Sequence, residues 1–130
     1  MVNFMQNNKN RPVYLNLFAI HLPITGMVSI LHRVTGVLWV LLLPIVLTLF
    51  QRSLENEASY LQVRALFSGT PARLVMLLLL WLFAQHFFSG LRHLLLDLDI
   101  GATLVVARSS AIWVFIASVG TTLLAALWLL

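Results

Sequence analysis

Long apolar runs, separated by polar segments, divide the chain into three candidate membrane-spanning segments. The runs cover residues 26–50, 72–96 and about 109–130. At a rise of about 1.5 Å per residue, a helix over 26–50 is about 37 Å long, which is enough to cross a hydrocarbon core of about 30 Å. Because unpaired backbone N–H and C=O groups are not tolerated in lipid, each span must be a helix. The pattern predicts an all-α membrane protein with three transmembrane helices in a bundle.

The polar segments predict how these helices are connected. Residues 51–71 form an extended polar stretch, and we expect a loop there. The acidic motif DLDIG, which begins at Asp97, predicts a turn between the second and third spans. Residues 13–23 alternate between apolar and polar and predict a short N-terminal interfacial segment. Since neither an internal repeat nor a linker is visible, residues 1–130 are predicted to form a single membrane domain.

The composition excludes several classes of protein. Hydrophobic residues make up 61% of the chain and charged residues only 9%, whereas soluble domains carry about 25% charged residues. This composition is too apolar for a soluble enzyme, a nucleic-acid-binding domain or a disordered tail. We therefore expect the chain to lie in a lipid bilayer. The chain has no cysteine, which excludes disulfides, thiolate metal sites and a cysteine nucleophile.

The basic residues predict the orientation in the membrane. Cytoplasmic segments of membrane proteins carry an excess of Lys and Arg. With the N-terminus in the cytoplasm, the cytoplasmic side collects Lys9, Arg11, Arg33, Arg92 and Arg108, and the opposite side collects Arg52, Arg64 and Arg73. This distribution favours a cytoplasmic N-terminus and a periplasmic C-terminus.

Two stripes of polar and small residues interrupt the apolar spans. Positions i, i+3, i+4 and i+7 share one helix face. Because consecutive spans are antiparallel, a stripe near the start of the first span lies at the same end of the bundle as one near the end of the second. We therefore expect one site, built jointly by two helices. The stripes consist of Ser29, His32, Arg33 and Gly36 in the first span, and of His86, Ser89, Gly90, His93 and Asp97 in the second.

Simpler interpretations exist for several of these residues. Arg33, Arg92 and His93 lie near helix ends, where long or polar side chains can extend toward lipid head groups. Asp97 has the position of a residue that ends a helix at the interface. The two stripe glycines suit close helix packing whether or not a ligand binds there.

His86 fits a simple interfacial role least well. It lies about 15 Å along the helix from Asp97 and is surrounded by phenylalanines. Three roles remain open for it: axial ligand of a haem, proton relay, or structural hydrogen bonding. A haem with two axial histidines needs a second ligand, and His93 lies on the same helix face and cannot supply it. The remaining sources are His21, His32 or a histidine of another chain.

Three segments of the chain carry a family resemblance. The chain resembles the cytochrome b membrane-anchor subunit of bacterial succinate dehydrogenase (complex II), of the proteobacterial succinate:ubiquinone oxidoreductase type. The signatures S-I-x-H-R-x-[TS]-G and H-x3-G-x-R-H-x3-D both occur in the expected order and spans. The matching segments are RPVYLNL from Arg11, PITGMVSILHRVTG from Pro23 and HFFSGLRHLLLD from His86.

The resemblance implies a role for each matching residue. His86 matches the axial ligand of the iron of haem b, and His32 and Arg33 match residues near the haem propionates. Ser29 and Arg33 match the ubiquinone site, while His93 matches a histidine close to the haem.

The resemblance also implies partners. The chain is expected to be a non-flavin subunit in the bacterial inner membrane, with no succinate-oxidising site of its own. FAD and the iron–sulfur clusters are expected on a flavoprotein subunit and an iron–sulfur subunit, and a second small anchor subunit is expected to share the haem. The alternatives are a fumarate reductase anchor that uses menaquinone, or a small structural or proton-relay membrane subunit.

Overall fold

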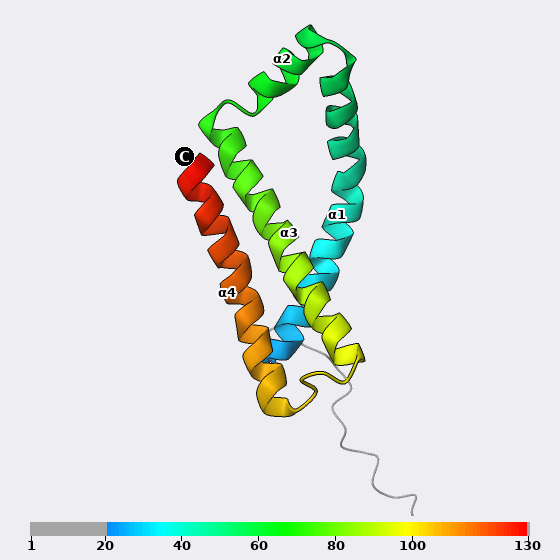
Figure 1. The fold of residues 1–130 in the computed structure, drawn as a ribbon, viewed down its shortest axis with the longest axis vertical. Helices are drawn as coiled ribbons and strands as arrows, with labels where there is room; N and C mark the ends of the chain where they lie inside the picture. Colours follow the sequence, from blue (N-terminus) through cyan, green and yellow to red (C-terminus); the bar gives the residue numbers. More distant parts are fainter. Residues whose placement is uncertain (1–20, 130) are drawn as a thin grey trace, which may run out of the picture.

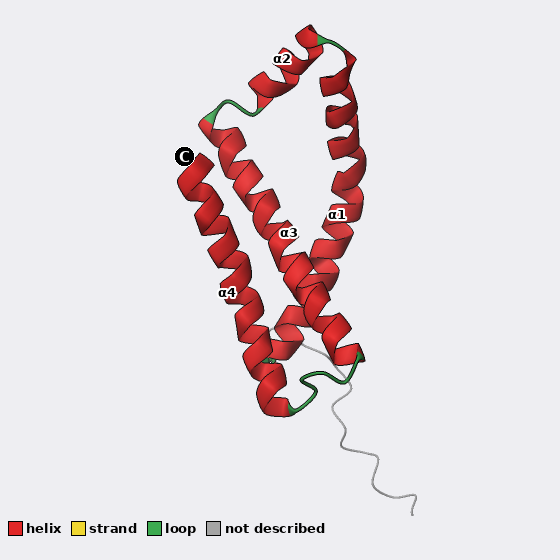
Figure 2. Ribbon diagram, viewed as in Figure 1, coloured by secondary structure: helices red, strands yellow, loops and turns green. Residues whose placement is uncertain are grey.

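The structure consists of helices joined by short connections. This computed structural model describes residues 21–129; residues 1–20 and 130 lie outside the described part. Along the described chain the elements are α1 (Ile24–Glu55), α2 (Glu57–Leu66), α3 (Thr70–Asp97) and α4 (Leu104–Leu129). Three of them, α1, α3 and α4, are long and apolar enough to cross a membrane (Figure 1, Figure 2). The prediction of an all-α membrane protein with three transmembrane helices is confirmed.

The segment between the first two spans differs from the prediction. The prediction of an extended loop over 51–71 is wrong, because α1 continues to Glu55 and α2 occupies most of the remaining residues. Asn56 separates the two helices with an extended backbone, and its side-chain oxygen accepts a hydrogen bond of 2.9 Å from the backbone N–H of Ser59. This contact caps the start of α2, which bridges α1 and α3 at one end of the bundle (Figure 1).

The other predicted boundaries shift by a few residues. Each spanning helix begins before the predicted position, at residues 24, 70 and 104. The predicted interfacial segment 13–23 lies outside the described residues except for 21–23, which are not helical. The prediction of a single domain over 1–130 stays a prediction, since residues 1–20 are outside this description.

Pro44 interrupts the hydrogen bonding of α1 in the middle of its span. Proline has no N–H to donate to the preceding turn, and its ring crowds the carbonyl one turn before it. The Thr48 hydroxyl donates a 2.8 Å hydrogen bond to the Pro44 carbonyl. The helix remains continuous and bends along its length (Figure 1). The bend carries the second half of α1 away from α3, so that the two helices pack closely only near the opposite end.

A tight turn connects α3 to α4. Gly101 has a φ of 78°, a left-handed conformation that glycine adopts at little cost, and Asp99 has a φ of 59°. The backbone N–H of Ile100 donates to the carbonyl of Leu95 over 2.9 Å, which closes the end of α3. The predicted acidic turn is therefore present, and it returns the chain so that α4 runs antiparallel beside α3 (Figure 1).

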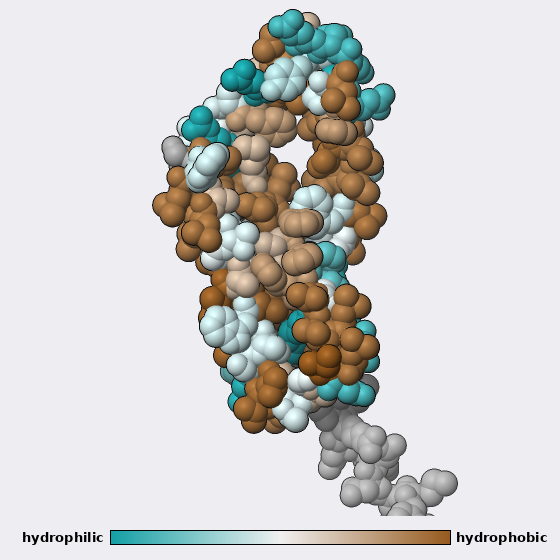
Figure 3. All heavy atoms as spheres, viewed as in Figure 1, coloured by the Kyte–Doolittle hydropathy of each residue, from teal (hydrophilic) through white to brown (hydrophobic). Residues whose placement is uncertain are grey.

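The buried core is small and lies near the α3–α4 turn. Val28 of α1 packs with Ala111 and Val114 of α4, and these three residues are 0–5% exposed. Most large apolar side chains instead face outward, and apolar residues cover most of the visible surface of the spans (Figure 3). Polar residues gather around α2 and near the opposite end of the bundle (Figure 3). This distribution is the one expected for a chain surrounded by lipid.

A polar cluster holds α3 against α4 in the middle of the bundle. Gln85 and Ser118 are fully buried, and the Ser118 hydroxyl donates a 2.7 Å hydrogen bond to the Gln85 side-chain oxygen. The Gln85 side-chain nitrogen donates to the hydroxyl of Ser89, which is also buried, over 3.3 Å. Hydrogen bonds between transmembrane helices contribute about 0.6 kcal/mol on average and up to about 1.7 kcal/mol.

Replacing Gln85 by Leu is expected to weaken the packing of α3 against α4. Leucine is similar in size to glutamine but forms no hydrogen bond, so we expect the protein to lose about 1–2 kcal/mol of stability. The thermal unfolding midpoint of the purified protein measures this loss. Gln62→Leu, on the exposed surface of α2, is the matched control and is expected to leave the midpoint unchanged. Equal midpoints for both variants would contradict a stabilising role of the Gln85 hydrogen bonds.

Candidate functional site

Three histidines from two helices form a stack near one end of the bundle. The ring of His32, on α1, lies between the rings of His86 and His93, both on α3. The ring centroids of His32 and His86 are 4.4 Å apart with an angle of 15° between the planes; those of His32 and His93 are 5.0 Å apart at 23°. As expected from the antiparallel order of the spans, the two polar stripes meet in one place.

Two glycines provide the space for this stack. A Cβ atom on Gly36 would lie 3.0 Å from Cε1 of His86, and one on Gly90 would lie 3.2 Å from Nε2 of His32. Each helix thus places a histidine against a glycine of the other helix. The same spacing, a histidine followed four residues later by a glycine, occurs on both helices, so the arrangement is reciprocal. Any larger side chain at either glycine would push the helices apart or displace a ring.

Hydrogen bonds fix the ring of His86. Its Nδ1 lies 3.2 Å from the carbonyl oxygen of His32 and 3.2 Å from the hydroxyl oxygen of Thr35. Since a carbonyl oxygen only accepts, Nδ1 carries the proton and donates it. The buried Thr35 hydroxyl donates in turn to the Leu31 carbonyl over 2.7 Å. Within the described chain Nε2 of His86 has no hydrogen-bond partner, and in this tautomer its lone pair is available to a metal or a proton donor.

His93 is held in a similar way by its own helix. Its Nδ1 lies 2.6 Å from the carbonyl oxygen of Ser89, one turn earlier on α3. Because the rings stack face to face, their nitrogen atoms do not converge on one point. Accordingly, the described residues contain no group of three or more His, Cys, Asp or Glu side chains placed to hold a bare metal ion. The cluster is therefore suited to a ligand that binds one ring nitrogen rather than several.

Two apolar grooves border His86. The larger, of about 490 Å³, is lined by His32, Arg33, Gly36 and His86 together with apolar residues of α1. The smaller, of about 260 Å³, runs along α3 past Gly90. Arg33 is exposed at the edge of the larger groove, where it adds a permanent positive charge beside the histidines.

Not every residue of the predicted stripes lines these grooves. Ser29 is half-buried one turn before Arg33 and is not part of the groove lining. Asp97 is the exposed last residue of α3, as its interfacial interpretation predicted. Arg92 points away from the histidines toward α4. His21 is exposed and precedes α1.

Two buried polar residues outside the predicted set support the site. Thr35 contacts the ring of His86, and Gln85, which precedes His86 in the sequence, is hydrogen-bonded to α4. Each is a polar residue inside an otherwise apolar span, and such positions are costly in lipid unless they are paired. That cost was a usable signal, although only the structure shows which partner each side chain takes.

The fold and the site define an integral membrane protein with three spans, in which histidines from two spans form one cluster. Residues 7–125 match the family described as succinate dehydrogenase/fumarate reductase transmembrane subunit, and the chain belongs to this family. It is similar to the succinate dehydrogenase cytochrome b556 subunit of Coxiella burnetii, at 31% identity over 94% of this chain and 98% of the relative. It is also similar to the succinate dehydrogenase cytochrome b560 subunit of Reclinomonas americana, at 35% identity over 69% of this chain and 66% of the relative.

The glycine–histidine packing predicts opposite effects for the same substitution at two glycines. Gly36→Ala places a methyl group against His86, and overpacking of this kind costs about 1–3 kcal/mol. At Gly120 of α4 a methyl group would meet nothing within 4 Å, and alanine favours a helix by about 1 kcal/mol over glycine. We expect a lower unfolding midpoint for Gly36→Ala and an equal or higher one for Gly120→Ala. Similar midpoints would show that the close approach at Gly36 is not required.

Proposed function

We propose that this chain is the haem b membrane anchor of a bacterial succinate dehydrogenase and that it helps to form the site where ubiquinone is reduced. The observation that carries the proposal is the state of His86. Its Nδ1 is hydrogen-bonded to the His32 carbonyl oxygen and to Thr35, its Nε2 has no hydrogen-bond partner within residues 21–129, and the residue lines an apolar groove. Membership in the family and the cytochrome names of both relatives support the same assignment.

The residues around His86 fit a haem b. A histidine that binds iron through one nitrogen usually donates the other N–H to an oxygen, which fixes the ring and makes it a stronger ligand. His86 has this arrangement, with Nε2 left for the iron. The apolar walls of the adjoining grooves suit a flat macrocycle, since apolar surroundings exclude water from the iron. When bound, the haem accepts and returns one electron at a time.

The polar edge of the larger groove suits the haem propionates. Arg33 and His32 line the same groove as His86. A guanidinium is always charged and forms paired hydrogen bonds with carboxylates, so Arg33 would hold a propionate and His32 would add a further donor. His93 stacks on His32 and would keep that ring in place close to the haem.

The second axial ligand would come from another chain. A haem lies between its two axial ligands, so two rings in stacked contact cannot both bind the same iron. His32 is stacked on His86 at 4.4 Å and is thereby excluded as the second ligand. We assign the second ligand to a histidine of a small partner anchor subunit that covers this face of α1 and α3.

Ser29 and Arg33 would bind ubiquinone at the same end of the bundle. They lie one turn apart on α1 and make no hydrogen bond within the described residues, so their donors are available. The Ser29 hydroxyl would donate to a quinone carbonyl oxygen. Arg33 would stabilise the negative charge that develops on that oxygen as electrons arrive.

The remaining steps belong to partner subunits. Succinate would be oxidised on a flavoprotein subunit that carries FAD, and the electrons would reach the quinone through the clusters of an iron–sulfur subunit. The end of the bundle that holds the histidines would then face these soluble subunits in the cytoplasm. The described arginines divide evenly between the two ends of the bundle, so the positive-inside argument depends on Lys9 and Arg11. We accordingly place the N-terminus in the cytoplasm and the C-terminus in the periplasm of a bacterial inner membrane.

Replacing His86 by Leu is expected to remove the haem while leaving the helix bundle folded. Leucine suits the apolar surroundings but cannot bind iron. The reduced-minus-oxidised absorption spectrum of the purified complex measures the loss of the b-type band, and circular dichroism measures the retained helix. Gln62→Leu, on the exposed surface of α2 and outside the cluster, is the control and should keep the full band. An unchanged spectrum in the His86 variant would show that another residue binds the iron.

Replacing Ser29 by Ala or Arg33 by Leu is expected to lower the rate of ubiquinone reduction. The rate of succinate oxidation measured with an artificial electron acceptor, which bypasses the quinone site, should stay the same. Loss of a neutral hydrogen bond costs about 0.5–1.5 kcal/mol and loss of one to a charged group about 1.5–3 kcal/mol, so Arg33→Leu should be the more severe change. Arg52→Leu, at the other end of α1, is the control. An equal fall in both activities would indicate a role in assembly, and no fall in either would place the quinone elsewhere.

A further inference from the structure

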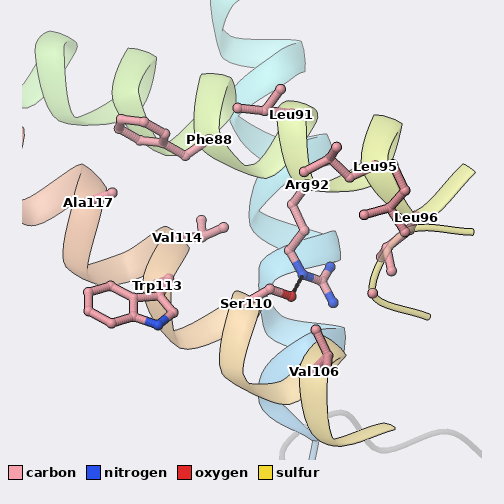
Figure 4. Close-up of a pocket in the computed structure, with 12 residues that line it drawn as sticks. Phe88, Leu91, Arg92, Leu95, Leu96, Val106, Ser110, Trp113, Val114 and Ala117 are labelled. Atoms are coloured by element: carbon pink, nitrogen blue, oxygen red, sulfur yellow. Dashed lines mark hydrogen bonds between the residues drawn. The ribbon is translucent and has the colours of Figure 1, made fainter. Parts of the chain in front are cut away.

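A third apolar groove lies between α3 and α4 at the same end of the bundle as the histidines. It has a volume of about 340 Å³, and its walls are largely aliphatic and aromatic side chains of the two helices (Figure 4). Phe88 and Leu95 of α3 face Trp113 and Val106 of α4 across it (Figure 4). The histidines face α1, whereas this groove faces α4, so the two sites use different sides of α3.

The groove contains one buried cation, Arg92. This residue is only 7% exposed, and its guanidinium lines the groove beside α4 (Figure 4). Its Nε donates to the hydroxyl of Ser110 over 3.0 Å, and one terminal nitrogen donates to the carbonyl of Ala107 over 3.1 Å. Both acceptors are uncharged, and a guanidinium has five N–H donors. With respect to residues 21–129, Arg92 therefore keeps unused donors and an uncompensated positive charge.

No acidic side chain in the described part of the chain balances this charge. The acidic side chains of the sequence are Glu55, Glu57, Asp97 and Asp99, all within the described residues, and none forms an ion pair with Arg92. A cation enclosed by apolar side chains is unfavourable unless an anion accompanies it. The groove thus combines an apolar surface with a requirement for negative charge.

The depth of Arg92 places that charge close to the membrane surface. Its partner Ala107 lies in the first turn of α4, and Arg92 itself is about 7.5 Å along α3 from Asp97, the last residue of that helix. Trp113 is 63% exposed at the groove and lies about 9 Å further along α4 than Ala107, at the depth of an acyl chain. An acyl chain in the groove would bring its phosphate to the level of the guanidinium.

We infer that this groove binds an anionic phospholipid, with an acyl chain against the apolar walls and the phosphate hydrogen-bonded to Arg92. The charge selects this occupant. A zwitterionic lipid supplies a phosphate together with its own cation, and a neutral isoprenoid or an apolar helix would leave Arg92 uncompensated. Arginine binds phosphate through paired N–H groups, which matches its unused donors.

Quenching of tryptophan fluorescence tests this inference on the assembled complex. Purified complex, washed free of exchangeable lipid in detergent, is titrated with phosphatidylglycerol or phosphatidylcholine whose acyl chains carry bromine, which quenches only nearby indoles. The contribution of Trp113 is the difference between the wild type and Trp113→Phe. We expect phosphatidylglycerol to quench it at about tenfold lower concentration than phosphatidylcholine, a ratio that corresponds to about 1.4 kcal/mol.

Variants separate Arg92 from general surface charge. Arg92→Gln should raise the half-quenching concentration of phosphatidylglycerol to that of phosphatidylcholine, while Arg92→Lys should retain part of the preference. Arg108→Gln removes an exposed cation of α4 that does not line the groove and should change the titration little. Raising the salt concentration should weaken the binding of phosphatidylglycerol and leave that of phosphatidylcholine unchanged.

Three results would overturn the inference. Equal quenching of the wild type by both lipids would mean that the groove takes acyl chains without recognising a head group. The absence of quenching by either lipid would mean that a partner helix covers the groove. Displacement of bound phosphatidylglycerol by a short-chain ubiquinone would mean that the groove belongs to the quinone. The first comparison uses only the wild type and Trp113→Phe, so it stands even if Arg92→Gln fails to assemble.

Discussion

Two glycines, one on α1 and one on α3, allow these helices to approach closely enough for their histidine rings to stack. Gly36 receives the ring of His86, and Gly90 receives the ring of His32. In lipid, helices gain little from apolar burial against each other, so close packing and hydrogen bonds decide where they associate. This contact fixes the crossing of α1 and α3, and the bend at Pro44 then carries the rest of α1 away from it.

The orientation of α3 follows from this crossing, and α3 connects all the polar features of the bundle. One side carries His86 and Gly90 toward α1, and another carries Gln85 and Arg92 toward α4. A rotation of α3 that broke the histidine stack would also break the hydrogen bonds to α4. The site is therefore positioned from both sides by polar contacts whose loss is costly in a membrane.

These contacts also determine the chemistry available to His86. The carbonyl of His32 accepts a hydrogen bond from His86, and the hydroxyl of Thr35, one turn further along α1, lies beside the same ring nitrogen. The proton is thereby held on Nδ1, and Nε2 has no hydrogen-bond partner among the described residues. His32 occupies one face of the His86 ring, so these two stacked rings do not lie on opposite sides of one bound group.

The sequence alone determined the class of this protein, its three spans and the end of the bundle where the site lies. Apolar runs long enough to cross a bilayer leave helices as the one possible structure, and the spacing of His86 and His93 places them on one face. The sequence did not determine the helix α2, because short polar helices depend on local capping such as that of Asn56. It also could not show that Arg92 turns toward α4 or that His32 stacks on His86. Those choices depend on which helix faces meet, and only the tertiary packing of α1, α3 and α4 decides that.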